Sequence, residues 1–385
     1  MSFITLEQVR AHARRAGFDL CGVAKVPHDG DFDELAHFSV WLSEGRAGEM
    51  EYLKARNEQG ELKRAALRNV APWARSVVIC ALNYNSSQPY STEMTDNSRG
   101  WISRYAWFGD KDKATDYHDV VLSRLRDVEA DLHVEADRVG KPLQTRCYVD
   151  TGPLVERVYA KYAGIGWIAK NTCIINQSLG SWLFLGTILT SLEFADDAPA
   201  ATLSIAADRC GSCTRCIEAC PTGALTEPYK MDARLCISYL TIEKRGQIPE
   251  ELRGQMGTNV FGCDICQDVC PWNGHAVQNE KVIGRAPRAM PVSSAPEFQP
   301  REELIAPRLE WLATMSREDF NQRFRGSPIK RAKYQGIRRN AIVSMGNSRD
   351  PQFMPLLERF SRDEDSVVAE HARWALQKLK SQQPT

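Results

Sequence analysis

The chain contains the stretch Cys210-Gly-Ser-Cys213-Thr-Arg-Cys216-Ile-Glu-Ala-Cys220-Pro221, and a second cysteine set follows at Cys236 and in Cys263-Asp-Ile-Cys266-Gln-Asp-Val-Cys270-Pro271. Thiolates separated by two residues can converge on one inorganic cube, whereas a fourth cysteine three residues on, followed by proline, faces a neighbouring cube. The pattern therefore predicts a ferredoxin-like unit with two 4Fe-4S clusters and interleaved ligands. The expected ligands are Cys210, Cys213, Cys216 and Cys270 for cluster 1, and Cys220, Cys236, Cys263 and Cys266 for cluster 2.

A pair of zinc sites is the alternative interpretation of these paired cysteines. The third cysteine at the same spacing and the two Cys-Pro endings favour iron–sulfur clusters. Cys236 stands far upstream of Cys263, with residues 242–262 inserted between them. We therefore expect the segment 238–257, which includes Lys244, to reach out from the clusters and contact another molecule.

Length and composition indicate several domains and exclude a generic polyanion binder. A chain of 385 residues is expected to divide into two or three domains. Basic and acidic residues number 49 each, so any nucleic-acid surface must be local. The N-terminus has no basic region followed by an apolar run, and no window approaches a membrane span. Together with reduced cysteines, these features predict a cytoplasmic protein.

Residues 1–197 are predicted to form an α/β domain, because helical and strand patterns alternate along them. The β-branched run 76–82 is expected to be a strand covered on both faces, and the aromatic-rich segment 83–113 a loop that lines a pocket. Asp150 closes the strand predicted at 143–150, where open α/β sheets place ligands. Helix capping is the alternative role for this carboxylate.

The stretch Gly164-Ile-Gly166 imitates a dinucleotide-binding fingerprint. It follows a predicted helix rather than a strand, which argues against a nicotinamide site. No flavin site is recognisable either. Because 4Fe-4S clusters pass electrons singly, the residues alone indicate a reductase with a further cofactor that receives these electrons, and Asp150 is available to supply a proton.

Residues 198–285 are assigned to the ferredoxin-like unit, and residues 286–385 to a linker, expected at 276–300, followed by a helical tail. Apolar residues of the tail recur after 31 residues, as in Ile337 and Val368, a spacing typical of a HEAT-like repeat. The segment 323–339 contains basic and aromatic residues and no acidic residue, which predicts a nucleic-acid surface, although such a run is often only a solvated face. The basic residues proposed for this surface are Arg325, Lys330, Arg331, Lys333, Arg338 and Arg339.

A series of motifs spans nearly the whole chain. In order, they are Gly48-Glu-Met-Glu-Tyr52-Leu53, Ile102-Ser103-Arg104-Tyr105-Ala-Trp107, Asp116-Tyr-His118-Asp119, Val149-Asp150-Thr-Gly-Pro, Ala163-Gly-Ile-Gly166-Trp-Ile-Ala-Lys170-Asn171 and the double Cys-Pro set. This combination resembles the epoxyqueuosine reductases, which perform the last step of queuosine synthesis on the tRNA wobble base. The resemblance implies reduction of epoxyqueuosine to queuosine, with electrons passing from the clusters to cobalamin and Asp150 donating a proton. It also implies a cobalamin-binding α/β domain similar in architecture to that of reductive dehalogenases.

The resemblance further implies a set of cobalamin neighbours, namely Arg64, Ser103, Asp150, Lys170, Asn171, Ile174, Gln177, Gly180 and Ser181. Some family members have cysteine where Ser103 stands, so a thiol is not essential there. His118 is not expected to bind cobalt, because the Asp-x-His-x-x-Gly pattern of base-off cobalamin proteins fails at Val121. Apolar surroundings covered by the cofactor should keep Asp150 protonated, since an unperturbed aspartate is ionised near neutrality.

The proposed tRNA contacts are Ser238, Lys244 and the six basic residues of the tail. The target base must leave its loop to reach the pocket, and it is expected to stack on Tyr105 or Trp107. An external low-potential electron donor is the other expected partner, and the protein is expected to be a monomer. Two rival readings make different predictions. A dehalogenase acting on small organics would have an export signal and no basic tail, and an electron carrier would need no acid at Asp150.

Overall fold

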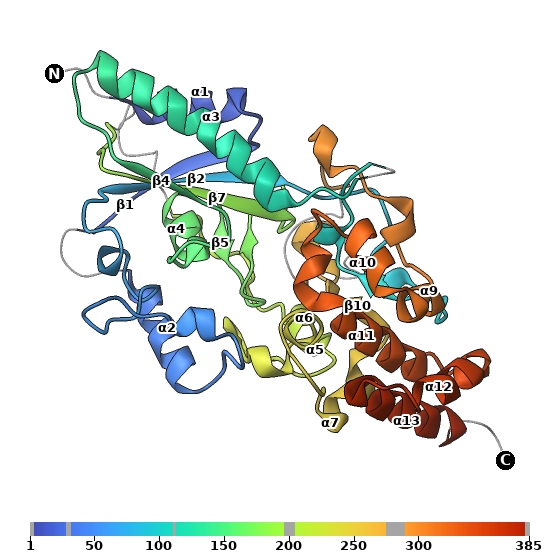
Figure 1. Ribbon diagram of the computed structural model, residues 1–385. Helices are drawn as coiled ribbons and strands as arrows, with labels where there is room; N and C mark the ends of the chain where they lie inside the picture. The colour runs from blue at the N-terminus through green and yellow to red at the C-terminus, as the bar shows by residue number, and fades with distance from the viewer. Residues whose placement is uncertain (1–3, 28–31, 111–112, 196–204, 275–288, 382–385) are drawn as a thin grey trace.

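The computed structural model describes residues 4–27, 32–110, 113–195, 205–274 and 289–381 (Figure 1). Its N-terminal part is built on a four-stranded sheet, in the order β1 (Leu20–Lys25), β2 (Ser76–Asn83), β7 (Leu183–Thr190) and β4 (Thr145–Tyr148). All three pairings are antiparallel. The α/β character agrees with the prediction, but this is not the open parallel sheet whose strand ends suggested Asp150 as a ligand-binding residue.

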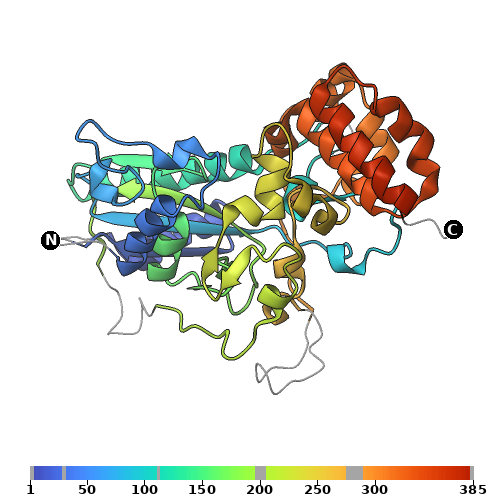
Figure 2. The same cartoon turned by 90° about the horizontal axis from the view of Figure 1, so that it is seen from below.

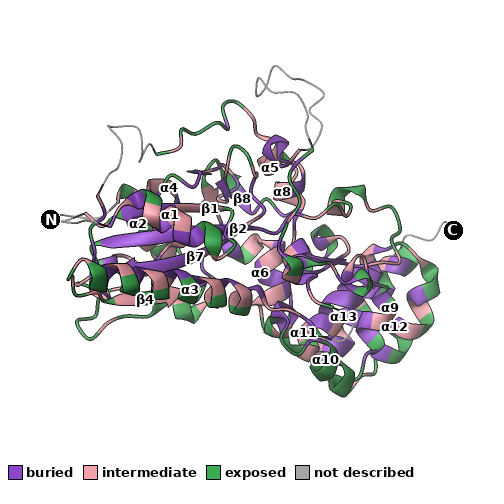
Figure 3. Cartoon of the chain, turned by 90° about the horizontal axis from the view of Figure 1, so that it is seen from above, coloured by how far each residue is buried: buried purple, intermediate pink, exposed green. Residues whose placement is uncertain are grey.

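Helices cover both faces of this sheet. The helices α1 (Leu6–Arg15) and α3 (Tyr117–Arg138) lie on one face and α4 (Glu156–Tyr162) on the other (Figures 1 and 3). Alternation along β2 sends Val78 into the core beneath α1 and α3, and Val77 into the core beneath α4. The predicted strand covered on both faces is therefore confirmed, because every residue of β2 is buried.

The aromatic-rich segment after β2 connects the sheet to the cysteine-rich unit. Its short strand β3 (Trp101–Ile102) pairs in parallel with β10 (Asn259–Phe261). Trp101 is buried, and its indole N–H donates to Oδ2 of Asp264 at 3.0 Å. Trp107 is also buried, and its indole N–H donates to the carbonyl of Ile102 at 2.7 Å. Trp107 is therefore a core residue, and the expectation that it stacks on an RNA base is wrong.

The cysteine-rich unit consists of short elements between the sheet and the C-terminal helices (Figure 2). They are α5 (Arg215–Glu218), β8 (Leu225–Glu227), β9 (Lys230–Met231), α6 (Ile237–Ile242), α7 (Glu250–Arg253), β10 and α8 (Ile265–Asp268). A hairpin of the N-terminal part, β5 (Trp167–Ile168) and β6 (Ile174–Ile175), packs against this unit, because Trp167 shares a small core with Cys210, Cys270 and Trp272.

The C-terminal part is helical. It contains α9 (Leu309–Thr314), α10 (Arg317–Arg323), α11 (Lys333–Asn347), α12 (Met354–Phe360) and α13 (Ser366–Ser381). The helix α11 is central, because it packs against α9, α13 and β10. Within the described parts of the chain, none of the helices has the length and apolar character needed to cross a bilayer.

The expectation of a linker at 276–300 is wrong for its C-terminal half, because Ala295 and Phe298 are buried in the core of the sheet domain. Asn83 Nδ2 also donates to the carbonyl of Pro291 at 2.9 Å. Residues 275–288 lie outside the described residues.

Candidate active site and cluster-binding sites

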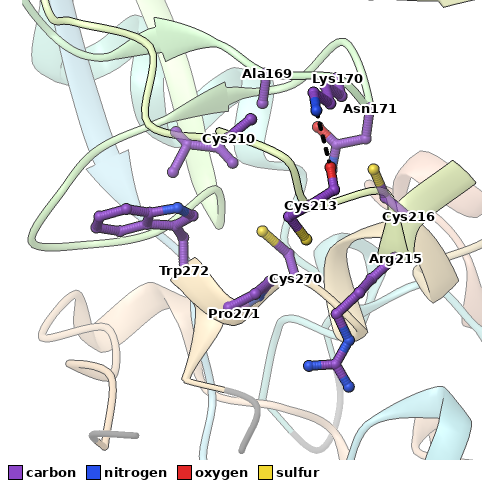
Figure 4. A pocket seen from close by; sticks show the side chains of 11 residues that line it. Ala169, Lys170, Asn171, Cys210, Cys213, Arg215, Cys216, Cys270, Pro271 and Trp272 are labelled. Atoms are coloured by element: carbon purple, nitrogen blue, oxygen red, sulfur yellow. Dashed lines mark hydrogen bonds between the residues drawn. The ribbon is translucent and has the colours of Figure 1, made fainter. Parts of the chain in front are cut away.

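Four cysteines meet in one pocket of the cysteine-rich unit. Cys210, Cys213, Cys216 and Cys270 line it together with Arg215 and Trp272 (Figure 4). These are the four cysteines that the spacing assigns to cluster 1. Burial, together with the neighbouring Cys210 and Cys213, raises the pKa of the Cys216 thiol to about 11. Thiols in such a place become thiolates when a cationic centre binds them, so the donor set suits an iron–sulfur cube.

The cysteines assigned to cluster 2 are also neighbours. Burial raises the pKa of Cys263 well above its usual value, and the charges of Cys236 and Cys220 add to this effect. Burial raises the pKa of Cys266 in the same way, with contributions from Cys263 and Cys236. Backbone N–H groups of Ser238 and Tyr239, in the first turn of α6, oppose the raised pKa of Cys236. The structure thus brings Cys236 to the other three ligands, despite its distance in sequence.

A large cavity at this site is assembled from three parts of the chain. Its volume is about 1000 Å³, and Asp150 of the sheet domain lines it together with Cys236 of the cysteine-rich unit and Lys333 of the C-terminal part. A second cavity of about 800 Å³ adjoins it and shares Tyr52 and Arg64 with it. Ligand pockets usually measure roughly 300–1,000 Å³, so the two together offer room for an unusually large cofactor or substrate.

Asp150 follows β4 and points into the larger cavity. Its backbone is left-handed, with φ of 55°, a conformation that aspartate tolerates better than most residues. Its side chain is 55% exposed, and Oδ2 accepts a hydrogen bond from the hydroxyl of Tyr117. The alternative role of Asp150 as a helix cap is wrong, because α4 begins at Glu156 with Val155 as its N-cap residue and no side-chain cap.

The start of α3 supports this carboxylate. The ring of Tyr117 stacks between those of His118 and Phe184, each at 4.1 Å between centroids. Asp116 caps the helix, and its Oδ1 lies 2.7 Å from Nδ1 of His118. Burial lowers the pKa of His118, but the hydrogen bond to Asp116 and the nearby charges outweigh it and raise the pKa above its ordinary value. Nε2 of His118 lies 3.9 Å from Oδ2 of Asp150.

Glu156 is a second acidic residue at the site, and sequence reasoning missed it. It lies in the first turn of α4 and lines the second cavity, and its buried Oε1 has no hydrogen-bond partner. Burial and, to a smaller extent, the charge of Asp150 raise its pKa to about 8. No motif marks this position, because its environment forms only when α4 packs beside the two cavities.

A relative from Xanthomonas campestris named epoxyqueuosine reductase is 35% identical to this chain over 96% of the chain and 94% of the relative. The chain belongs to the epoxyqueuosine reductase family. A Synechocystis relative of the same name is 37% identical over 84% of the chain and 99% of its own length. Residues 64–151 match the family model described as "Epoxyqueuosine reductase QueG, DUF1730", and residues 209–273 match a 4Fe-4S double cluster binding domain. The prediction of two 4Fe-4S clusters is thereby confirmed, and zinc is not the metal that this domain binds.

Solved structures of epoxyqueuosine reductases share the whole fold. One, solved with an epoxyqueuosine-modified tRNA stem loop, is 31% identical with a TM-score of 0.76, covering 97% of this chain and 89% of that one. The enzyme from Streptococcus thermophilus is 26% identical with the same TM-score, covering 98% and 91%. Reductive dehalogenases align with a TM-score of only 0.40, which is too low to bear on the architecture.

The structure separates the expected cobalamin neighbours into two groups. Arg64 and Asp150 line the large cavities. The other seven do not, and several have protein partners instead. Lys170 and Asn171 bind backbone carbonyls of the cysteine loops, and the N–H of Ser181 donates to Oδ1 of Asn273. The seven residues that do not line either large cavity are Ser103, Lys170, Asn171, Ile174, Gln177, Gly180 and Ser181.

The expected tRNA contacts divide in the same manner. The cavity wall and rim include Ser238, Lys330, Arg331 and Lys333. Arg325 is exposed, and Lys244 is ion-paired with Glu49.

Arg338 and Arg339 lie in α11, away from this rim. Arg338 is ion-paired with Asp363 at 2.7 Å. The prediction that Arg339 contacts RNA is wrong, because this residue is 2% exposed and donates to carbonyls inside the protein.

Proposed function

We propose that this chain is an oxidoreductase that reduces the epoxide of epoxyqueuosine in tRNA, using two 4Fe-4S clusters and cobalamin. The observation that carries the proposal is that an acid, Asp150, and a cluster ligand, Cys236, line the same cavity. Removing an epoxide oxygen as water, with formation of a carbon–carbon double bond, consumes two electrons and two protons. The clusters provide electrons one at a time, and the cavity is where such electrons can meet a proton donor.

The chemistry of the two cavities fits a cobalamin, which supplies a cobalt centre able to gather two single electrons. The side chain of Glu156 supports the proposal that the cavities hold this cofactor. With a pKa of about 8 it is mostly protonated at neutral pH, so it can donate a hydrogen bond to an amide oxygen of the kind that surrounds the corrin ring. Arg64, shared by both cavities, presents a cation on the same wall.

Asp150 is the proposed proton donor to the oxygen that leaves. The hydroxyl of Tyr117 holds Oδ2 of this side chain in place. When substrate and cofactor fill the cavity they exclude water, and exclusion of water favours the uncharged carboxylic acid that can donate a proton. Tyr105 lines the same cavity and is proposed to stack on an extruded base.

The positive rim of the cavity is the proposed tRNA surface. Lys330, Arg331 and Lys333 lie beside the cavity that holds Asp150, so phosphates bound there bring an anticodon loop to the acid. Arg331 is ion-paired with Glu243 at 2.8 Å, which fixes its guanidinium for such a contact. A tRNA substrate and thiolates that must stay reduced support a cytoplasmic reaction, for which we propose an external low-potential electron donor.

The C-terminal helices are proposed to be a HEAT-like unit that supports this rim. Apolar residues of α11 and their counterparts 31 residues later in α13 are all buried, and the two helices pack against each other. The pairs are Ile337 with Val368, Ala341 with Ala372, and Met345 with Leu376.

The test is anaerobic reduction of epoxyqueuosine tRNA with and without added cobalamin. The purified protein should contain about eight irons, as two cubes require, and turnover should depend on cobalamin. Asp150→Asn should keep its iron, its cobalamin and its tRNA affinity but lose turnover. Asp127→Asn, on the exposed side of α3, is the matched control and should behave as wild type. Iron without cobalamin uptake would favour the electron carrier.

A further inference from the structure

The hairpin after α4 has no part in the proposed acid chemistry, although its sequence is distinctive. It carries Gly166-Trp-Ile-Ala-Lys170-Asn171, and β5 and β6 pair through Trp167 with Ile175 and Ile168 with Ile174. Gly166 is required by close approach, because a Cβ at this position would lie 2.2 Å from the carbonyl oxygen of Ile175. The hairpin therefore has a fixed shape that holds Trp167 in one place.

The loop of this hairpin binds the cysteine loops of both clusters. Nζ of Lys170 donates to the carbonyl of Gly211 at 2.6 Å. It also donates to the carbonyl of Cys213 at 3.0 Å (Figure 4). Nδ2 of the next residue, Asn171, donates to the carbonyl of Cys266 at 3.2 Å. Two neighbouring side chains thus connect the sheet domain to the loop of cluster 1 and to a ligand of cluster 2.

One N–H group of the hairpin is buried against the ligands expected for cluster 1. Trp167 is 2% exposed and packs with Cys210, Cys270 and Trp272, and its indole N–H has no hydrogen-bond partner among the described residues. A buried N–H without an acceptor is costly, so a group that binds among these cysteines can satisfy it. This N–H is therefore available to the anionic sulfurs of cluster 1.

We infer that this hairpin tunes cluster 1, with Trp167 and Lys170 raising its reduction potential as positioning residues for electron entry. Reduction adds an electron to a cluster that already carries anionic thiolates. Hydrogen bonds to the sulfurs and a nearby cation stabilise the more negative, reduced form. The ammonium of Lys170 lines the cluster 1 pocket, while the cavity that contains Asp150 is lined by Cys236 of cluster 2. The hairpin thus acts on the cluster farther from the acid.

The inference rests on the proposed function only in assuming that both clusters are present. Its test is a potentiometric titration of the anaerobic holoprotein, followed by electron paramagnetic resonance and carried out without tRNA. In Trp167→Phe, which removes the N–H and keeps a ring, one cluster reduction should become about tenfold less favourable, ~59 mV for a one-electron couple, and the other should stay unchanged. Lys170→Met should shift the same step in the same direction, and Lys170→Arg, which keeps the charge, should restore most of it.

Matched controls remove the same groups elsewhere. Trp73→Phe changes an indole in the sheet domain, and Lys380→Met removes an ammonium from the exposed end of α13. Neither should move a potential. If Trp167→Phe keeps its full iron content and its reduction potentials are unchanged, the inference is overturned. If Lys170→Met fails to assemble its clusters, the Trp167→Phe measurement alone is the test. A wild-type enzyme that binds iron but does not reduce epoxyqueuosine would instead count against the proposed function.

Discussion

Replacement of Arg339 by Met should destabilise the protein and leave RNA affinity at its wild-type value. The guanidinium is buried in α11, where Nη1 donates to the carbonyls of Lys244 at 2.9 Å and Gly246 at 2.8 Å, and Nη2 to that of Leu240 at 2.8 Å. Burial lowers the pKa of Arg339 to about 10, so the group is still charged at neutral pH. It therefore joins the C-terminal helices to the segment between Cys236 and Cys263.

The size of the effect follows from the fate of the acceptors that lose a donor. A buried acceptor left without a donor costs about 1–3 kcal/mol. Leu240 is buried, whereas Gly246 is exposed and Lys244 half-buried, so water can replace the lost donor at the latter two. Methionine keeps the packing of the arginine stem. Oδ1 of the buried Asn340 also loses its donors, because it accepts from Nε and Nη2 of Arg339. We expect a loss of about 3 kcal/mol, shared between the Leu240 carbonyl and this amide oxygen.

Urea unfolding, followed by cluster absorbance and circular dichroism, measures the loss of stability. A binding assay at several salt concentrations tests whether the RNA affinity of the variant equals that of the wild type. The control is Arg362→Met, at an exposed arginine of the same helical part, which should change the stability by about 0.5 kcal/mol or less. Wild-type stability of Arg339→Met combined with weaker RNA binding would refute the assignment of this arginine to the protein core.

Three further predictions concern the cavity. Asp150→Asn should lower kcat by roughly 10²–10⁴-fold, the usual contribution of a general acid, with tRNA affinity unchanged in a binding assay. Lys330→Gln and Lys333→Gln together should weaken tRNA binding and make the slope of log affinity against log salt shallower, whereas Lys380→Gln should leave that slope unchanged. Glu156 has a folded-state pKa of about 8 against an ordinary value of 4.5, so the folded cofactor-free protein keeps a proton that the unfolded chain releases between these values. The stability of the protein should therefore fall as pH rises through this window. In Glu156→Gln, the difference between the urea midpoints measured at about pH 5 and at about pH 9 should be smaller than in the wild type.

The cysteine ligands and the central strand could be predicted because their information is local. Cluster geometry restricts cysteine spacing directly, and Cys210, Cys213 and Cys216 indeed lie in one pocket. The β-branched run 76–82 predicts a strand, and in the structure its neighbouring residues Val77 and Val78 are buried in two different cores, one on each face of the sheet. The direction of its neighbours could not be predicted, since an apolar pattern records that a strand is covered on both faces and not which way the next strand runs.

The active site was only partly predictable, because its residues meet through tertiary packing. Asp150 stands out at a strand end, but its partner Tyr117 opens a helix 33 residues earlier and reaches it only when α3 crosses the sheet. Arg339 was misread because a basic run does not reveal which helix face it occupies. The following residues, from Ala341 to Gly346, are all buried and leave α11 without a polar face, which is the signal of a helix surrounded on every side.

The irregular spacing of the second cysteine set explains how a cluster comes to lie beside the acid. In a regular repeat Cys236 would stand close to Cys263, and no helix could form between them. Here α6 begins directly after Cys236, and the hydroxyl of Tyr239 in that helix accepts a hydrogen bond from the backbone N–H of Glu49 at 2.9 Å. Gly48 makes this contact possible, because a Cβ there would lie 2.5 Å from the Tyr239 hydroxyl oxygen. The Gly48 turn is therefore shaped to receive α6, and by fixing α6 it holds Cys236 at the wall of the cavity that Asp150 lines.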